Sequence, residues 1–271
     1  MPPSFPLHPG YLSAHAASQQ RPGLISVSDL KVGDVLLCWP EHPDFAQRRI
    51  QSATGSKYVH AAILMSETPA YAAEVGFGLD MLTKKSLRRT AISDLVARYG
   101  HVTVLRHPDA WQDSSVLRLR RFIARQLGRT RYRAFKALRV EKRGRAREKN
   151  QLALLDGYFA GSSKPRASKS AYFCSEFVIQ CFMEGGYLHE SAAVIYCAED
   201  TSPGRLARDN TFGFPVGYLT NTNAYVVPDA DPYRCQTRFG VMFPSMKSRR
   251  GLRRAKLVRC RLVRETGPSS T

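Results

Sequence analysis

The chain has 271 residues, of which 43% are hydrophobic and 10% aromatic. That composition is sufficient for a hydrophobic core and excludes wholesale disorder. Lysines and arginines outnumber aspartates and glutamates by 41 to 22, for a formal net charge of +19. Such a charge attracts polyanions, whether nucleic acid, an anionic membrane or an acidic partner, but it does not define a fold. A binding surface and a solvated surface are both open interpretations of it.

Six cysteines are scattered along the chain with no C-x-x-C pair, and no histidine cluster has metal-ligand spacing. They stand at positions 38, 174, 181, 197, 235 and 260. The pattern favours free thiols in a reducing compartment, with a few disulfides as the alternative, and it argues against a zinc site. No apolar signal-peptide core and no apolar run of about 18 residues is present. We therefore expect a soluble, cytoplasmic protein, unless it is exported by another route.

The first part of the chain predicts a leader followed by strands. Residues 1–24 are rich in Pro, Ser, Ala and Gln, as is typical of a flexible leader. A single domain is expected over residues 25–228. Its first half shows four apolar runs bounded by turn residues, which predict closely spaced strands in an antiparallel meander. These runs are residues 32–39, which open with a Gly-Asp turn, then 58–65, 70–75 and 102–105, with a short helix at 46–53.

The second half of the domain predicts helices. Residues 114–127 carry apolar side chains at helical spacing with arginines on the other face, and 132–138 continue into a basic segment. Together they form a basic helical insert over about 114–150. Residues 172–184 predict a buried helix that ends at the Gly185-Gly186 pair. A Ser-Pro helix start at Ser202 and a strand at 218–227 complete the domain.

Residues 229–271 form a basic C-terminal tail in which Leu and Val alternate with Lys and Arg. This pattern is typical of an amphipathic helix at an anionic membrane surface or on an acidic partner, and equally of a solvated tail. The insert and the tail are therefore candidate contacts for a membrane or polyanion. The sequence does not define the oligomeric state.

Cys174 stands where a thiolate nucleophile is expected, at the predicted start of a helix after a polar loop. There the helix dipole and the unpaired backbone N–H groups stabilise negative charge on the sulfur and on an oxyanion. A buried packing cysteine is the alternative. Cys181, deep in the same predicted helix, is interpreted as a packing residue.

A cysteine nucleophile needs a base, and His60 is the best candidate. It is the histidine that lies inside an otherwise apolar predicted strand, where an unpartnered imidazole is costly. Glu74 lies in a similar apolar setting on the next predicted strand. If these strands pair through the turn at residues 67–70, Glu74 reaches the far nitrogen of His60.

A set of sequence elements, in this order, resembles the YiiX/YebB-like permuted papain-like cysteine hydrolases, relatives of NlpC-type peptidases and of lecithin:retinol acyltransferase. They cover roughly residues 27–215. The main elements are Val32-Gly33-Asp34-Val35-Leu36, Thr54 to Ile63 with His60, Glu74, and the Tyr172 to Phe177 segment around Cys174. Between and after them, Leu127 to Tyr132 resembles the family's Gly-x-x-Tyr element, and Ser202 to Ala207 resembles its Ser-Pro-x-x-Leu element. In that family the histidine precedes the cysteine.

The resemblance implies an α+β, circularly permuted papain-like (NlpC-type) fold. An antiparallel sheet or small barrel would pack against helices that include the cysteine-bearing one. It also implies a Cys174–His60–Glu74 triad and no metal or organic cofactor. Tyr58, two residues before His60 and expected on the same face of its strand, and Ser175, which follows Cys174, are the candidate substrate-binding residues, with a packing role as the alternative for Tyr58. One departure is Arg133, which stands where the family usually has Asp.

These features predict an enzyme that transfers an acyl group through the thiol, most simply an amidase or peptidase acting on peptide, isopeptide or peptidoglycan-like amides. A lipid acyltransferase or phospholipase is the second hypothesis, since the basic surface suits anionic membranes. A nucleic-acid or membrane-binding module on the same scaffold is the third, because a fold does not guarantee a function.

Overall fold

The computed structural model describes residues 23–76, 87–109, 111–132, 150–161, 171–189, 198–221, 225–228 and 231–233. The chain divides into two compact units, Met1–Arg234 and Cys235–Thr271, and every described residue belongs to the first. The expected leader before residue 23, the helical piece after residue 132 with its basic segment, and the basic tail apart from residues 231–233 fall outside the described residues. Gly23 and Leu24, predicted as the end of the leader, instead form a short strand, β1. Within the described ranges, no helix combines the length and apolar character needed to cross a membrane.

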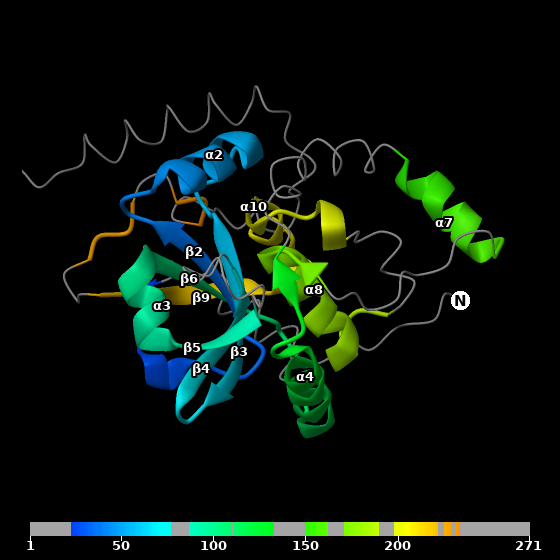
Figure 1. Cartoon of the computed structure of the whole chain (residues 1–271), viewed down its shortest axis with the longest axis horizontal. Helices are drawn as coiled ribbons and strands as arrows, with labels where there is room; N and C mark the ends of the chain where they lie inside the picture. Colours follow the sequence, from blue (N-terminus) through cyan, green and yellow to red (C-terminus); the bar gives the residue numbers. More distant parts are fainter. Residues whose placement is uncertain are drawn as a thin grey trace, which may run out of the picture. The chain divides into compact units, whose positions relative to one another are not determined.

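A mixed seven-stranded sheet forms the centre of an α+β unit (Figure 1), in the order β1-β9-β6-β2-β3-β4-β5. Every neighbouring pair is antiparallel except β1 and β9, which run parallel. A separate parallel pair, β7 with β8, lies before the cysteine-bearing helix. The strands are β1 (Gly23–Leu24), β2 (Val35–Pro40), β3 (His60–Glu67), β4 (Ala70–Val75), β5 (Leu87–Ala91), β6 (Gly100–Arg106), β7 (Arg131–Tyr132), β8 (Ala171–Tyr172) and β9 (Phe214–Thr220).

The predicted meander is confirmed for β2, β3 and β4, which pair in sequence order. β6, expected as the next strand, instead pairs with β2, and β5 takes the place beside β4. The last strand was predicted too late in the chain: β9 begins at Phe214 because its pairing with β6 starts there, opposite Arg106. Local turn residues thus predicted the hairpins, but they did not predict that β6 returns to pair with β2.

Helices cover both faces of the sheet. Figure 1 shows α3 on one side and α4 with α8 on the other. Two hydrophobic clusters follow this division. One contains Leu119 and Phe122 of α4 with Phe177 and Phe182 of α8, and the other contains the buried side chains of α3. The helices are η1 (Val27–Asp29), α2 (Phe45–Thr54), α3 (Ile92–Tyr99), α4 (Asp113–Gln126), α7 (Gln151–Phe159), α8 (Cys174–Gly185), η2 (Ala198–Asp200), α10 (Pro203–Leu206) and η3 (Asn210–Phe212).

Several helix ends form where the sequence predicts them. α8 ends at Gly186, whose φ of 86° is in the left-handed region that glycine adopts without steric cost. Ser202 caps α10 by accepting from the N–H of Arg205, and Pro203 occupies the first turn, where a missing N–H is harmless.

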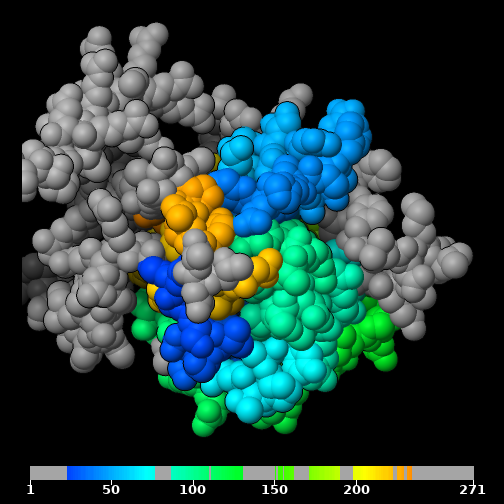
Figure 2. Space-filling view, turned by 90° about the vertical axis from the view of Figure 1, so that its left-hand side faces the viewer, coloured from blue at the N-terminus to red at the C-terminus, as the bar shows by residue number. Residues whose placement is uncertain are grey.

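The sequence reasoning missed β5 and α3, which follow one another without a break. No side-chain cap marks the start of α3 at Ala91. The available signal was the helical spacing of the four side chains that α3 buries against the sheet. Those side chains are Ile92, Leu95, Val96 and Tyr99. Figure 2 views the molecule from the α3 side, where this helix forms part of the surface.

Candidate active site

The hairpin of β3 and β4 places a histidine and a carboxylate side by side. The strands pair from Glu67 opposite Ala70 to Ala62 opposite Glu74, so Glu74 lies diagonal to His60 on the neighbouring strand. Nε2 of His60 lies 2.6 Å from Oε2 of Glu74. The two side chains are only 7% and 0% exposed. The contact expected from strand pairing is therefore present, away from bulk water.

Cys174 lies at the first position of α8, which packs against β3. The backbone N–H of Phe173 donates to the carboxylate of Glu176 at 3.2 Å, which fixes the start of the helix. The Cys174 side chain is buried, and its interaction with the His60 imidazole raises the pKa of that ring. Because Glu74 occupies Nε2 of the imidazole, Nδ1 is the nitrogen left for the thiol. The structure thus brings Cys174 and Glu74 next to the same imidazole, that of His60.

The imidazole of His60 holds its proton strongly. Burial lowers the pKa of His60, but hydrogen bonds to Cys174 and Glu74 outweigh it and raise that pKa to about 9. Burial likewise raises the pKa of Glu74, yet the hydrogen bond and the charge of His60 hold it well below its usual range. The protonated imidazole of His60, which lies next to both Glu74 and Cys174, can therefore donate a proton to a leaving group.

Glu74 has three further partners that sequence reasoning did not predict. Its Oε1 accepts from Arg88 Nε at 2.7 Å, Thr90 Oγ1 at 2.6 Å and Arg98 Nη1 at 2.9 Å. Arg88 and Thr90 come from β5, where Arg88 is the direct register partner of Glu74, and Arg98 comes from α3. Because Oε1 is held by three donors, the carboxylate has a fixed orientation toward the imidazole.

Tyr99 of α3 holds the ring of His60 from one face. The two rings stack with centroids 5.5 Å apart and planes 8° apart. Stacking limits rotation of the imidazole and adds to the orientation that Glu74 imposes. The missed helix α3 therefore supplies two contacts of the site, through Tyr99 and Arg98.

Tyr58 does not share the face of His60, so that part of the expectation is wrong. Strand β3 begins at His60, and Tyr58 precedes it, so the alternation of a strand does not extend to this residue. Its side chain packs in the cluster on the α8 side, and its hydroxyl donates to Asp231 at 2.9 Å and contacts Thr103 at 2.8 Å.

Ser175 is also engaged within the protein. Its hydroxyl donates to the carbonyl oxygen of Thr201 at 2.6 Å, and the residue is fully buried. This bond ties the first turn of α8 to the segment that leads into α10. Substrate binding by Tyr58 and Ser175 stays a prediction.

Two other cysteines provide a contrast to Cys174. Cys181 is fully buried in the core, and burial raises the pKa of its thiol, which confirms its interpretation as a packing residue. Cys38 is the register partner of His60 on β2. Burial, with the nearby Glu74 and Cys174, raises the pKa of the Cys38 thiol well above its ordinary value. Both thiols keep their protons at neutral pH.

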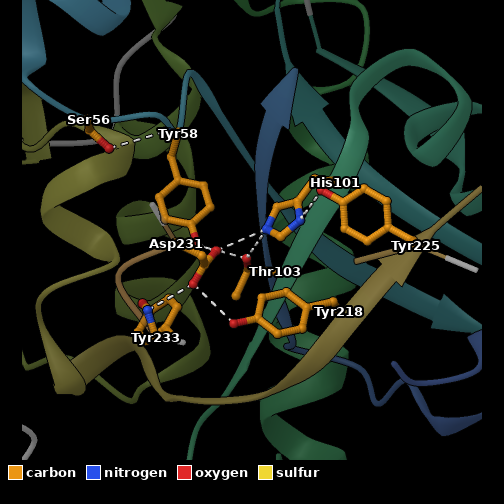
Figure 3. Close-up of polar contacts among 8 residues, drawn as sticks. All are labelled: Ser56, Tyr58, His101, Thr103, Tyr218, Tyr225, Asp231 and Tyr233. Carbon is orange, nitrogen blue, oxygen red and sulfur yellow. Dashed lines mark hydrogen bonds and ion pairs between the residues drawn. The ribbon is translucent and has the colours of Figure 1, made fainter. Parts of the chain in front are cut away.

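A second histidine also lies in a strand, contrary to the expectation that His60 alone does so. His101 of β6 is buried, and its Nε2 lies 3.0 Å from Oδ2 of Asp231 (Figure 3). Its Nδ1 lies 2.9 Å from the hydroxyl of Tyr225. Burial, followed by the charges of Glu41 and Asp231, raises the pKa of Tyr225 to about 12, so this hydroxyl keeps its proton.

Asp231 is bound by four neighbours in this second cluster. Besides His101, it accepts from the hydroxyls of Tyr58 and Tyr218 and from the backbone N–H of Tyr233, at 2.8 to 3.0 Å. Burial raises the pKa of Asp231, but the hydrogen bonds from His101 and the Tyr233 N–H lower it further than burial raises it. The cluster anchors the chain segment that ends at Tyr233, beyond the predicted domain end at residue 228.

No described residues form a group of three or more histidines, cysteines and carboxylates that could hold a metal ion. No model of a known protein family matches the chain, and no curated protein is significantly similar to it. Among solved structures, the chain is similar to the crystal structure of the metalloprotein YiiX from Escherichia coli O157:H7 (DUF1105). The two are 18% identical with a TM-score of 0.38, and the match covers 57% of this chain and 66% of that one.

Proposed function

We propose that this chain is a cysteine hydrolase with a permuted papain-like arrangement, in which Cys174, His60 and Glu74 form a triad. The observation that carries the proposal is the His60 imidazole, which contacts Glu74 at 2.6 Å and whose pKa is raised by both Cys174 and Glu74. A nucleophile at a helix start, a base and an orienting carboxylate are the three parts that covalent acyl transfer requires.

Each group has a defined task in the reaction. His60 takes the proton of Cys174, the sulfur attacks the carbonyl carbon of the substrate, and the backbone N–H groups at the start of α8 stabilise the oxyanion. His60 then gives this proton to the leaving group, whose bond to the carbonyl carbon breaks as the carbonyl re-forms as a thioester on Cys174. Water, deprotonated by His60, attacks the thioester, the acyl group leaves as a carboxylic acid, and His60 returns the proton to the sulfur. Glu74, fixed by its three other donors, stabilises the imidazolium throughout.

The substrate that we propose is an amide bond in a peptide, an isopeptide or a peptidoglycan-like molecule. A screen of peptides, peptidoglycan fragments and phospholipids, with the wild-type protein and Cys174→Ala, tests it. We expect cleavage of an amide by the wild type alone. Cleavage of phospholipid alone would favour the lipid acyltransferase hypothesis instead. Nucleic-acid or vesicle binding that weakens steeply with salt and does not depend on Cys174, without any turnover, would favour a binding module.

A further inference from the structure

We propose that Arg88 forms an anion subsite beside the triad and that the acyl substrate carries a carboxylate close to its scissile carbonyl. This inference rests on the proposed function and deepens it, because it names a chemical feature of the substrate. A guanidinium is well suited to the task, since its two amino nitrogens bind a carboxylate in parallel.

The guanidinium of Arg88 has donors to spare. Only its Nε donates a hydrogen bond, to Oε1 of Glu74 at 2.7 Å. Within the part of the chain that the structure describes, its two amino nitrogens have no hydrogen-bond or ion-pair partner, and the side chain is 38% exposed. By contrast, Arg98 donates from Nη1 to Glu74 and also lies over the ring of Tyr99. Of these two arginines, Arg88 is therefore the one whose two amino nitrogens are both free in the described part of the chain.

The charges around Glu74 do not cancel. One carboxylate oxygen accepts from the guanidiniums of both Arg88 and Arg98. A proton moving between Cys174 and His60 leaves the total charge of that pair unchanged. Because that pair is neutral or positive when His60 holds its proton, the described part of the site carries at least one more positive than negative charge, next to groups that are shielded from water. An anionic substrate group would neutralise this excess where electrostatic interactions are strong.

Gly76 shows that Arg88 and the imidazole border the same space. A β-carbon added to this glycine would lie 3.6 Å from Cε1 of His60 and 3.7 Å from Nη2 of Arg88. Both are ordinary van der Waals distances, and no other described side chain approaches that point within 4 Å. Cε1 lies between the two ring nitrogens, one of which serves Cys174. A group bound to Arg88 through this space would therefore lie close to the reacting sulfur.

The next residue, Arg89, provides a matched control. It carries the same charge on the same strand, but its register partner is Ala73 and its guanidinium lies over the ring of Tyr71, 4.9 Å from the centroid. Neighbouring residues of a strand point to opposite faces, so Arg89 faces away from Glu74. Loss of Arg89 changes the net charge as loss of Arg88 does, without touching the subsite.

The test measures alkylation of Cys174 by paired reagents that differ only in charge. Iodoacetate, iodoacetylglycine and iodoacetyl-β-alanine place a carboxylate at increasing distances from the reacting carbon, and their primary amides are the neutral partners. In each case the sulfur bonds to carbon as iodide leaves. The ratio of the anionic to the neutral rate is compared with that of N-acetylcysteine. We expect the wild-type ratio to exceed the reference about tenfold for at least one pair.

The variants distinguish a subsite from a structural role. In Arg88→Gln the enhanced ratio should fall to the N-acetylcysteine value, while Arg89→Gln should keep it. If Arg88 only positions Glu74, Arg88→Gln lowers both rates and leaves the ratio unchanged, which overturns the inference. Gly76→Ala supplies a second variant without a charge change, and its methyl group should lower the ratio by filling the space. An unchanged ratio there contradicts the proposed location.

The same data separate this inference from the proposed function. If Cys174 reacts with the neutral reagents in a way that requires His60, the pair of nucleophile and base stands whatever the ratio shows. If the neutral reaction does not require His60, the proposed function fails first. Only a His60-dependent reaction without a carboxylate preference refutes the Arg88 subsite alone.

Discussion

The unit contains two buried histidine–carboxylate pairs that differ in what lies on the far side of the imidazole. His60 has Glu74 on Nε2 and the thiol of Cys174 on the other side. His101 has Asp231 on Nε2 and the hydroxyl of Tyr225 on Nδ1. A phenol whose pKa is raised to about 12 keeps its proton at neutral pH, so it is a structural donor and not a nucleophile.

The carboxylates of the two pairs are also held differently. Glu74 accepts from two half-exposed arginines, whose charges a ligand can reach. The carboxylate oxygens of Asp231 instead accept hydrogen bonds from tyrosine hydroxyls and a backbone N–H, all within the core. The comparison indicates that a buried histidine–carboxylate pair becomes a candidate active site only when a nucleophile and an accessible binding group adjoin it.

The largest expected difference between the pairs is in thiol reactivity. In the proposed function His60 accepts the proton of Cys174, so His60→Ala should lower the rate of Cys174 alkylation by neutral iodoacetamide about a hundredfold or more. His101→Gln should leave the rate per folded molecule unchanged. Peptide mapping by mass spectrometry measures both. Equal losses of alkylation rate in the two variants would contradict the functional distinction between the two histidine–carboxylate pairs.

The second pair should dominate stability instead. Asp231→Ala leaves His101 and the hydroxyls of Tyr58 and Tyr218 without their buried partner. We expect the free energy of unfolding to fall by about 3–5 kcal/mol, as is typical when one member of a buried polar network is removed. Urea unfolding followed by circular dichroism measures this loss. A loss below about 1 kcal/mol would show that the cluster does not anchor the C-terminal segment.

The free energy of unfolding should depend on pH through the titration of His60. Its pKa is about 9 in the folded protein and near 6.5 when unfolded, so the folded state binds more protons in that interval. The His60 contribution is therefore complete below pH 6.5 and is lost as the pH rises through about 9. The decrease should be on the order of 1–3 kcal/mol and absent in His60→Gln. Unfolding midpoints at several pH values give the slope, and an identical slope in the variant would contradict the assignment.

The smallest expected effect is that of Tyr225→Phe. This change removes one hydroxyl from Nδ1 of His101 and keeps the ring, so it should cost about 1 kcal/mol of stability. Thermal unfolding measures it, and the alkylation rate of Cys174 should not change. A reduced rate would mean that Tyr225 acts on the reaction and that the second pair is not purely structural.

The proximity of Cys174, His60 and Glu74 could be predicted because local sequence patterns encode the elements that carry them. A tight hairpin aligns β3 with β4, and a polar loop followed by apolar residues marks the start of α8. Arg88 and Arg98 could not be predicted in the same way. Their roles depend on the register of β5 against β4 and on the docking of α3, neither of which was expected.

The second pair was beyond prediction for a related reason. His101 and Asp231 are separated by 130 positions, and neither lies in a motif that joins them. The backbone path from β9 to Tyr233 brings them together, and loop paths of this kind leave little periodic signal. The available signal was the position of His101 next to an apolar run: the predicted strand starts at residue 102, and extending it by one residue would have included this histidine.

The most direct test of the triad is to trap the acyl group on the protein. An activated ester such as p-nitrophenyl acetate is mixed with the wild type, His60→Ala and His101→Gln, quenched in acid and mapped by mass spectrometry. The account predicts an acetyl group on Cys174 in the wild type and in His101→Gln, and none in His60→Ala. Acetylation of other cysteines, or of Cys174 regardless of His60, would contradict it.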